Sequence, residues 1–276
     1  MEITFIGGGN MAGALIAGLL KKGLAAGSLR VVELSVQARE HLEQTYGVAT
    51  YPDLAADAAA AGAIVLAVKP QQLFAVAERL RPWLRGQLVI SIAAGVRASD
   101  LSRWLGGYGA VVRVMPNTPA MVLSGMSGLF ALPGVSAGQR QQADTILGAV
   151  GTTLWLEEEA QMDAVTAVAG SGPAYVFYFI EALEEAAITL GLSAAQARRL
   201  SLETFLGASR LASQGGEDVA TLRARVTSKG GTTERALQAL EDTGVKRQIV
   251  AAVRAAAERS RELGEALGKA DQPPKR

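Results

Sequence analysis

The first half of the chain alternates short apolar segments with longer stretches whose apolar residues recur at helical spacing. The apolar segments predict strands at Ile3–Ile6, Leu29–Val32, Ala63–Val68, Leu88–Ile92 and Ala110–Val114. Stretches between them, such as Leu73–Leu84 and Ala98–Leu105, predict helices. Regular alternation of strand and helix is typical of a parallel sheet built from βαβ units, so this half predicts an α/β fold.

The second half is predominantly helical. A helix over Gln139–Val150 and a short strand over Thr152–Leu156 precede a pattern that is almost wholly helical from Gln161 onward. A kink or break is expected at Gly170–Pro173, because proline lacks an amide donor. Ala174–Ile188 is more apolar than a surface helix requires, which suits a buried central helix or a subunit interface. Further helices are predicted at Ala194–Ala212, Val219–Arg225, Thr233–Glu241 and Val245–Leu267.

A glycine motif follows the first predicted strand directly. Gly7, Gly9 and Ala12 fit the G-x-G-x-x-G/A fingerprint in its required context of strand, turn and helix. Gly7 permits the tight turn, Gly9 lets the backbone approach a pyrophosphate, and Ala12 lets the helix pack close to the sheet. The free N–H groups of the helix start would face the phosphates. The motif therefore predicts a dinucleotide cofactor, with a ligand-free glycine turn as the alternative.

The end of the second strand bears on the choice of cofactor. Glu33 lies 20 residues after Gly13, where an acidic residue binds the adenine ribose. A carboxylate there favours the free 2′-hydroxyl of NAD, whereas Ser35 and Arg39 are near enough to support the 2′-phosphate of NADP. A solvent-facing Glu33 at a strand end is an equally simple interpretation. The sequence leaves the preference between NAD and NADP open.

Composition narrows the chemistry. The 276 residues are 49% hydrophobic and 19% charged, with a net charge of +1 and no strongly basic or acidic half. This balance does not suit a nucleic-acid-binding or membrane-surface protein. There is no cysteine and a single histidine, His41, which excludes thiolate chemistry and disfavours metal clusters and Ser-His triads. No basic leader or long apolar run is evident, so we expect a soluble, cytoplasmic protein.

Three further segments, read together with the glycine motif, give a family resemblance. They are Val114–Pro119 (VMPNTP), Ala169–Tyr175 (AGSGPAY) and Val226–Thr233 (VTSKGGTT). In this order and spacing the chain resembles pyrroline-5-carboxylate reductase from Ile3 to about Leu263. The resemblance implies hydride transfer from NAD(P)H to the C=N carbon of 1-pyrroline-5-carboxylate, giving L-proline. It also implies a Rossmann-type cofactor domain over residues 1–159, followed by an all-α substrate-binding and dimerisation domain over residues 160–276.

The resemblance also implies site residues. Ser228 and the N–H groups of Gly230, Gly231 and Thr232 would hold the substrate carboxylate, and the catalytic Thr233 hydroxyl would hydrogen-bond the ring nitrogen. Cofactor contacts are implied at Ile6, Gly7, Gly8, Gly9, Asn10, Met11, Glu33, Ser35, Ala67, Val68, Lys69, Pro70, Ala93, Ala94 and Asn117. No metal is expected. The helical domain would pair with that of a second copy, and five such dimers can form a decamer.

The chemistry agrees with the residues present. A protonated cyclic imine is already electrophilic, so its reduction needs positioning and one hydrogen bond more than a strong general acid. Other features depart from the usual family pattern: Lys229 replaces a common proline, Gly215–Asp218 replaces a Glu-His-Pro run, and Glu33 is unexpected for an NADP enzyme.

Two other functions would fit parts of the sequence. A relative of the β-hydroxyacid dehydrogenases would carry a lysine in a helix of the second domain as the general acid. Residues 160–203 contain no lysine, which argues against this class. A non-catalytic NAD(P)-binding sensor would have no reason to keep the arrangement from Ser228 to Thr233.

Overall fold

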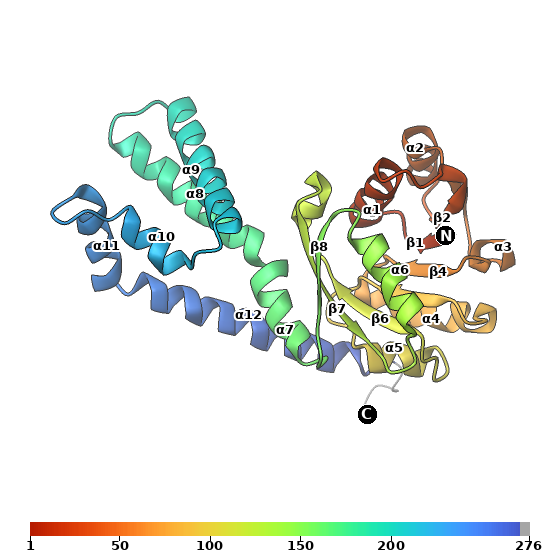
Figure 1. The fold of residues 1–276 in the computed structure, drawn as a ribbon. Coiled ribbons are helices and arrows are strands. Elements are labelled where there is room, and N and C mark those ends of the chain that lie inside the picture. Colours follow the sequence, from red (N-terminus) through yellow and green to blue (C-terminus); the bar gives the residue numbers. More distant parts are fainter. Residues whose placement is uncertain (271–276) are drawn as a thin grey trace. The chain divides into compact units, whose positions relative to one another are not determined.

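The computed structural model describes residues 1–270, which divide into two compact units. One unit combines Met1–Ser171 with the chain from Ala256 onward, and the other is Gly172–Ala255. Figure 1 shows both units coloured along the chain. The end of the predicted second domain, residues 271–276, lies outside the described residues.

The first unit is built on one sheet, which has eight strands within the described residues, in the order β3-β2-β1-β4-β5-β6-β7-β8. Neighbouring strands from β3 to β6 are parallel, β7 is antiparallel to β6, and β8 is parallel to β7. The strands are β1 (Ile3–Ile6), β2 (Leu29–Val32), β3 (Ala49–Tyr51), β4 (Ala63–Leu66), β5 (Leu88–Ser91), β6 (Val111–Met115), β7 (Gly125–Ala131) and β8 (Gly151–Trp155). The parallel α/β fold predicted for this half is confirmed.

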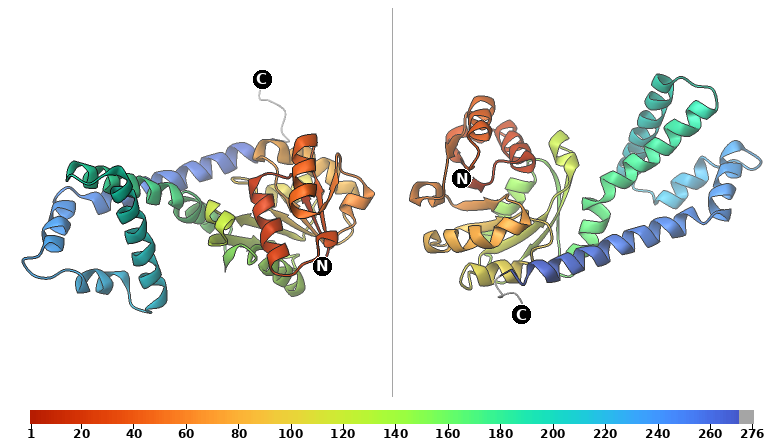
Figure 2. Two further views of the ribbon diagram at one scale, coloured as in Figure 1. Left: turned by 90° about the horizontal axis from the view of Figure 1, so that it is seen from above. Right: turned by 180° about the vertical axis from the view of Figure 1, so that it is seen from behind.

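Helices cover both faces of the sheet, because successive strand residues point to opposite sides. Phe5 packs into one core with side chains of α1, α2 and α6, whereas Ile6 packs into a second core with α3, α4 and α5. Figure 2 shows the sheet between these helices from two further sides. The helices are α1 (Asn10–Lys21), α2 (Val36–Tyr46), α3 (Ala56–Ala59), α4 (Leu73–Leu80), α5 (Ala98–Trp104) and α6 (Ala137–Leu147). Short 3₁₀ turns lie at Ala26–Ser28, Pro70–Gln72, Arg81–Trp83 and Thr118–Val122.

Strand β7 is absent from the sequence prediction. Its segment contains two glycines and lacks the β-branched residues that mark strands. Gly128 has a packing role, because a Cβ there would lie 2.6 Å from Cγ1 of Val165 in α7. The glycine therefore admits a helix against the sheet at the expense of strand propensity.

The first unit also contains α7 (Gln161–Val165) and the last part of α12 (Val245–Leu267). Ser260 of α12 donates a hydrogen bond to Asp163 of α7, at 2.7 Å. Between α7 and α8, the interruption expected near Gly170 takes the form of a π-helical turn over Thr166–Gly170. The division between the two units falls directly after it, at Ser171.

The second unit is helical and includes α8 (Gly172–Thr189), α9 (Ala194–Gln214), α10 (Val219–Arg225), α11 (Thr232–Asp242) and the first part of α12. Helices α8 and α9 run side by side (Figures 1 and 2). No side chain of α8 is buried, and Phe177 and Tyr178 are 60% and 70% exposed. The apolar helix thus presents an open face, which favours the interface interpretation over a buried central helix. None of the helices in residues 1–270 has the length and apolar content needed to cross a membrane.

Candidate active site

The predicted cofactor residues gather at one edge of the sheet. Each segment follows the carboxyl end of one of the neighbouring strands β2, β1, β4, β5 and β6. Strand β1 lies between β2 and β4, so the chain passes to opposite sides of it at this point. Such a switch point is where open α/β sheets bind ligands.

Gly7 turns the chain at the end of β1. Its φ of +100° is a left-handed conformation that glycine adopts without strain. A Cβ on Gly7 would lie 2.6 Å from the carbonyl oxygen of Ala67, the residue that follows β4. The Gly7 N–H donates to the Val32 carbonyl at 2.8 Å. Gly7 therefore binds together the ends of three adjacent strands.

The start of α1 has the features of an anion site. Gly9 is the N-cap residue, no side chain caps the helix, and its first turn has no acidic residue. A Cβ on Gly9 would meet no protein atom within 4 Å. The first N–H groups of a helix have no partner inside it, so those of Asn10 and Met11 are donors that an anion beside Gly9 can use. This geometry fits a pyrophosphate.

The next strand ends supply small and polar groups. After β4, Lys69 is exposed and precedes the 3₁₀ turn that begins at Pro70, while Ala67 and Val68 are half-buried. After β5, Ala93 is buried and its N–H donates to the Ser91 hydroxyl at 3.4 Å. Ala94 is exposed, so of these two alanines it is the one that a ligand can contact.

Asn117 follows β6, and both ends of its side-chain amide form hydrogen bonds with the backbone. Its Nδ2 donates to the Ala169 carbonyl at 3.1 Å, and its Oδ1 accepts from the Met126 N–H at 2.9 Å. It thereby ties β7 to the π-helical turn. These bonds favour a structural role, and its predicted contact with the cofactor stays a prediction.

Glu33 faces the glycine turn. Its carboxylate accepts hydrogen bonds from the N–H groups of Gly8, at 2.8 Å, and Ser35, at 2.9 Å. Arg39 donates to the carbonyl oxygens of Glu33 and Leu34 at 2.7 and 2.9 Å. The alternative of a solvent-facing Glu33 does not describe this arrangement.

The predicted substrate loop lies in the second unit, at the start of α11. Gly230 has a φ of +74°, and Gly231 is the N-cap residue. A Cβ on Gly231 would lie 2.6 Å from the Ser228 hydroxyl oxygen, so only glycine leaves that hydroxyl in place. Thr232 and Thr233 form the first turn of α11, and no side chain caps it. The loop thus gathers a hydroxyl and helix-start N–H groups in one turn.

Two of the predicted donors are engaged within the loop. The Gly231 N–H donates to the Ser228 carbonyl at 3.0 Å, and the Gly230 N–H donates to the Glu234 carboxylate at 2.7 Å. Glu234 was missed by the sequence reasoning. The available signal was its place in the first turn of the helix that the Gly-Gly-Thr-Thr motif opens.

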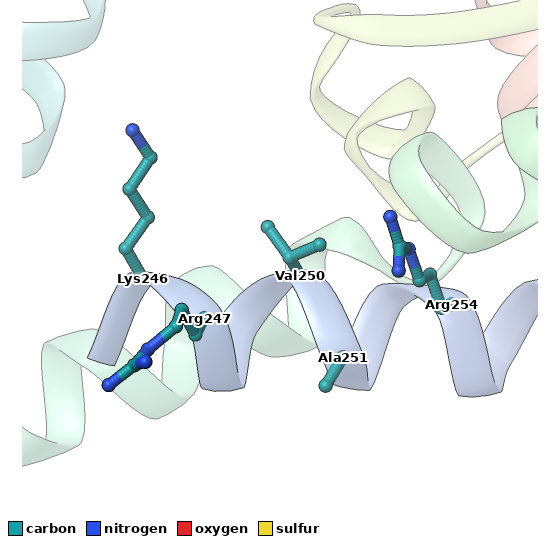
Figure 3. A pocket seen from close by; sticks show the side chains of 5 residues that line it. All are labelled: Lys246, Arg247, Val250, Ala251 and Arg254. Carbon is teal, nitrogen blue, oxygen red and sulfur yellow. The ribbon is translucent and has the colours of Figure 1, made fainter. Parts of the chain in front are cut away.

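A basic hollow of about 570 Å³ lies along α12 in the second unit (Figure 3). Lys246, Val250 and Arg254 point to the same side of the helix, one turn apart, and Arg247 and Ala251 complete the lining. The hollow offers neither a glycine turn nor a hydroxyl group. Its composition does not match the predicted cofactor or substrate contacts.

Two segments of the chain match known protein families. Residues 159–263 match the family described as pyrroline-5-carboxylate reductase dimerisation. Residues 2–95 match the family described as NADP oxidoreductase, coenzyme F420-dependent.

Individual relatives match nearly the whole chain. A pyrroline-5-carboxylate reductase of Pseudomonas aeruginosa is 46% identical, covering 97% of this chain and 98% of its own. The solved structure of a pyrroline-5-carboxylate reductase from Coxiella burnetii has a TM-score of 0.90 at 42% identity, covering 95% of this chain and 98% of its own. The structure of the Plasmodium falciparum pyrroline carboxylate reductase, solved with NADP bound, has a TM-score of 0.85 at 29% identity, covering 96% and 98%.

Proposed function

Since the chain belongs to the pyrroline-5-carboxylate reductase family, we propose that its two glycine loops share the reduction of 1-pyrroline-5-carboxylate to L-proline. The Gly7–Met11 turn binds the NAD(P)H cofactor, and the Ser228–Thr233 loop binds the substrate. The observation that carries the cofactor role is the uncapped start of α1 beside Gly9, at the switch point of the sheet. When bound, the reduced nicotinamide supplies a hydride to the imine carbon.

The chain's own residues supply binding and orientation. Ser228 and the N–H groups of the loop hold the substrate carboxylate at the helix start. For this, the Gly230 and Gly231 N–H groups exchange the acceptors that they have on Glu234 and Ser228. The Thr233 hydroxyl hydrogen-bonds the ring nitrogen. Small residues at Ala93 and Ala94 leave room beside the nicotinamide. Positioning and one hydrogen bond suffice, since the protonated imine is already electrophilic.

An assay of the purified protein tests this function. Incubation with 1-pyrroline-5-carboxylate should oxidise NADH or NADPH, followed at the nicotinamide absorbance, and should yield L-proline. A saturated analogue of the substrate, in which no C=N bond remains, is the control and should give no oxidation. Absence of oxidation with both cofactors would refute the proposed function.

Glu234 should compete with the substrate carboxylate for the Gly230 N–H, because both groups are anions and the N–H is a single donor. Glu234→Gln is therefore expected to lower the KM for 1-pyrroline-5-carboxylate by about two- to fivefold, the modest effect of an exposed charge. Steady-state kinetics at saturating cofactor measure it. Glu203→Gln makes the same charge change at an exposed position of α9, outside the loop sequence, and should leave the KM unaltered. A raised KM in Glu234→Gln would instead assign Glu234 to substrate binding.

The helical second unit indicates how copies of the protein assemble. The protein is a homo-oligomer through its dimerisation domain, and we extend this to a decamer of five dimers. An apolar groove of about 810 Å³ supports a partner surface here; its lining includes Tyr175, Tyr178, Leu183, Leu240 and Ile249. Light scattering of the purified protein would distinguish dimer from decamer.

Residues 1–159 are proposed as the cofactor domain and residues 160–276 as the substrate-binding and dimerisation domain. Support comes from the family match that begins at residue 159. The enzyme is also proposed to act in the cytoplasm, where reduced nicotinamide cofactors are available to it. Fluorescence microscopy of the tagged protein would test the location.

A further inference from the structure

We infer that Glu33 makes NADH, and not NADPH, the preferred cofactor of this chain, an inference that rests on the proposed function. Glu33 directly follows β2, beside the end of β1, because Val32 and Ile6 are paired in the sheet. Its carboxylate is held from two sides, by the Gly8 N–H at 2.8 Å and the Ser35 N–H at 2.9 Å. The negative charge is thereby fixed against the glycine turn.

The packing around Gly8 keeps the carboxylate in this place. A Cβ on Gly8 would lie 2.7 Å from Cδ1 of the buried Leu42 and 3.3 Å from Oε2 of Glu33. Gly8 thus lets the turn approach α2 and the carboxylate together. A carboxylate at the end of the second strand accepts hydrogen bonds from the ribose hydroxyls of NADH, whereas it repels the additional phosphate of NADPH.

Two groups near Glu33 could offset this repulsion, and the structure directs both of them to the turn between β2 and α2. Arg39 directs Nη1 to the carbonyl oxygens of Glu33 and Leu34, which closes the turn between β2 and α2. The Ser35 hydroxyl accepts from the Ala38 N–H at 3.3 Å as the N-cap of α2, and it donates to Gln37 at 3.2 Å.

The other titratable side chains of α2 do not supply a cation that could bind the 2′-phosphate of NADPH. His41 bonds to Thr45 one turn further along the helix, and the exposed Glu40 and Glu43 supply no positive charge. Glu33 is therefore the ionised group directly on the glycine turn, and it has the sign that disfavours a 2′-phosphate.

The test measures binding separately from turnover. The purified full-length protein is titrated with NADH and with NADPH, without substrate, and the nicotinamide fluorescence gives each Kd. We expect NADH to bind at least about tenfold more tightly, because like charges at close range weaken association strongly. The kcat/KM values with 1-pyrroline-5-carboxylate should show the same preference. Equal or tighter binding of NADPH would overturn the inference.

Variants of Glu33 test whether this residue causes the preference for NADH. Glu33→Gln keeps an amide oxygen that can accept a hydrogen bond but removes the charge, and it should reduce the NADH preference to within about threefold. Glu33→Ser is the second variant, with the same expected direction, and the thermal midpoint of each reports whether it is folded. Glu40→Gln removes a nearby exposed charge and should retain the wild-type ratio. A wild-type ratio in folded Glu33→Gln and Glu33→Ser would exclude Glu33 as the determinant.

Failure of the proposed reaction and failure of the cofactor preference give different experimental results. Tight NADH binding without oxidation by 1-pyrroline-5-carboxylate would refute the proposed reaction and leave the cofactor preference standing. Oxidation of NADPH in preference to NADH would leave the reaction standing and refute the preference.

Discussion

Thr233→Val is expected to lower kcat/KM for 1-pyrroline-5-carboxylate by roughly 5- to 150-fold, with the cofactor Kd unchanged. Valine matches the shape of threonine but has no hydroxyl, so the hydrogen bond that we propose to the ring nitrogen of the substrate is lost. Leaving such a group without a partner costs about 1–3 kcal/mol, which converts to the stated range. The hydroxyl lies in the first turn of α11, whereas the proposed cofactor site lies at the ends of the strands.

Two measurements separate a catalytic role for Thr233 from a structural one. Steady-state kinetics give kcat/KM, and fluorescence titration with the cofactor gives its Kd. Thr243→Val is the matched control: it removes a hydroxyl at the other end of α11, where that hydroxyl donates to the Ala239 carbonyl. An unchanged kcat/KM in Thr233→Val would remove this residue from the mechanism.

Glu159→Ala should lower the free energy of unfolding by about 3 kcal/mol, the range for breaking a buried ion pair. Glu159 accepts hydrogen bonds from the Arg113 guanidinium at 3.0 Å and from the Ala98 N–H at 2.6 Å. The Arg113 side chain on β6 is only 6% exposed. Without Glu159, this charge would stay buried with no carboxylate beside it, and α5 would lose a hydrogen bond at its first residue.

Chemical denaturation measures the effect, and two variants control for it. The combined change Arg113→Met with Glu159→Leu removes both charges and should recover much of the loss, because apolar replacement of a whole buried pair is often neutral. Glu258→Ala breaks an exposed pair with Arg261 on α12 and should change stability far less. Equal losses from Glu159→Ala and Glu258→Ala would show that the burial of Arg113 is of no consequence.

The sequence predicted the elements in which local pattern and tertiary environment agree. The bounds of α10 and α12 match the prediction, because helical periodicity and end signals coincide there. Strand β7 was missed, because the fold uses Gly128 to admit Val165 and the segment loses its strand signature. Distant packing of this kind leaves no periodic trace in a sequence.

In the candidate site, too, some features could be predicted from the sequence and others could not. The places of Gly7 and Gly9 followed from the motif, since a motif specifies backbone conformation. Side-chain direction did not follow: the sequence could not show that Glu33 faces Gly8, or that Asn117 bonds to Ala169 and Met126. Those contacts depend on which strand ends meet, and only the folded sheet determines that.

The bond between Gly230 and Glu234 has a consequence for the end of the reaction. Substrate and L-proline carry the same carboxylate, so a loop that gripped this group without competition would hold the product as firmly as the substrate. Glu234 offers the Gly230 N–H another acceptor at 2.7 Å. On the proposed function, the loop would therefore contain its own means of product release, because Glu234 would lower its affinity for proline and speed the departure of the product.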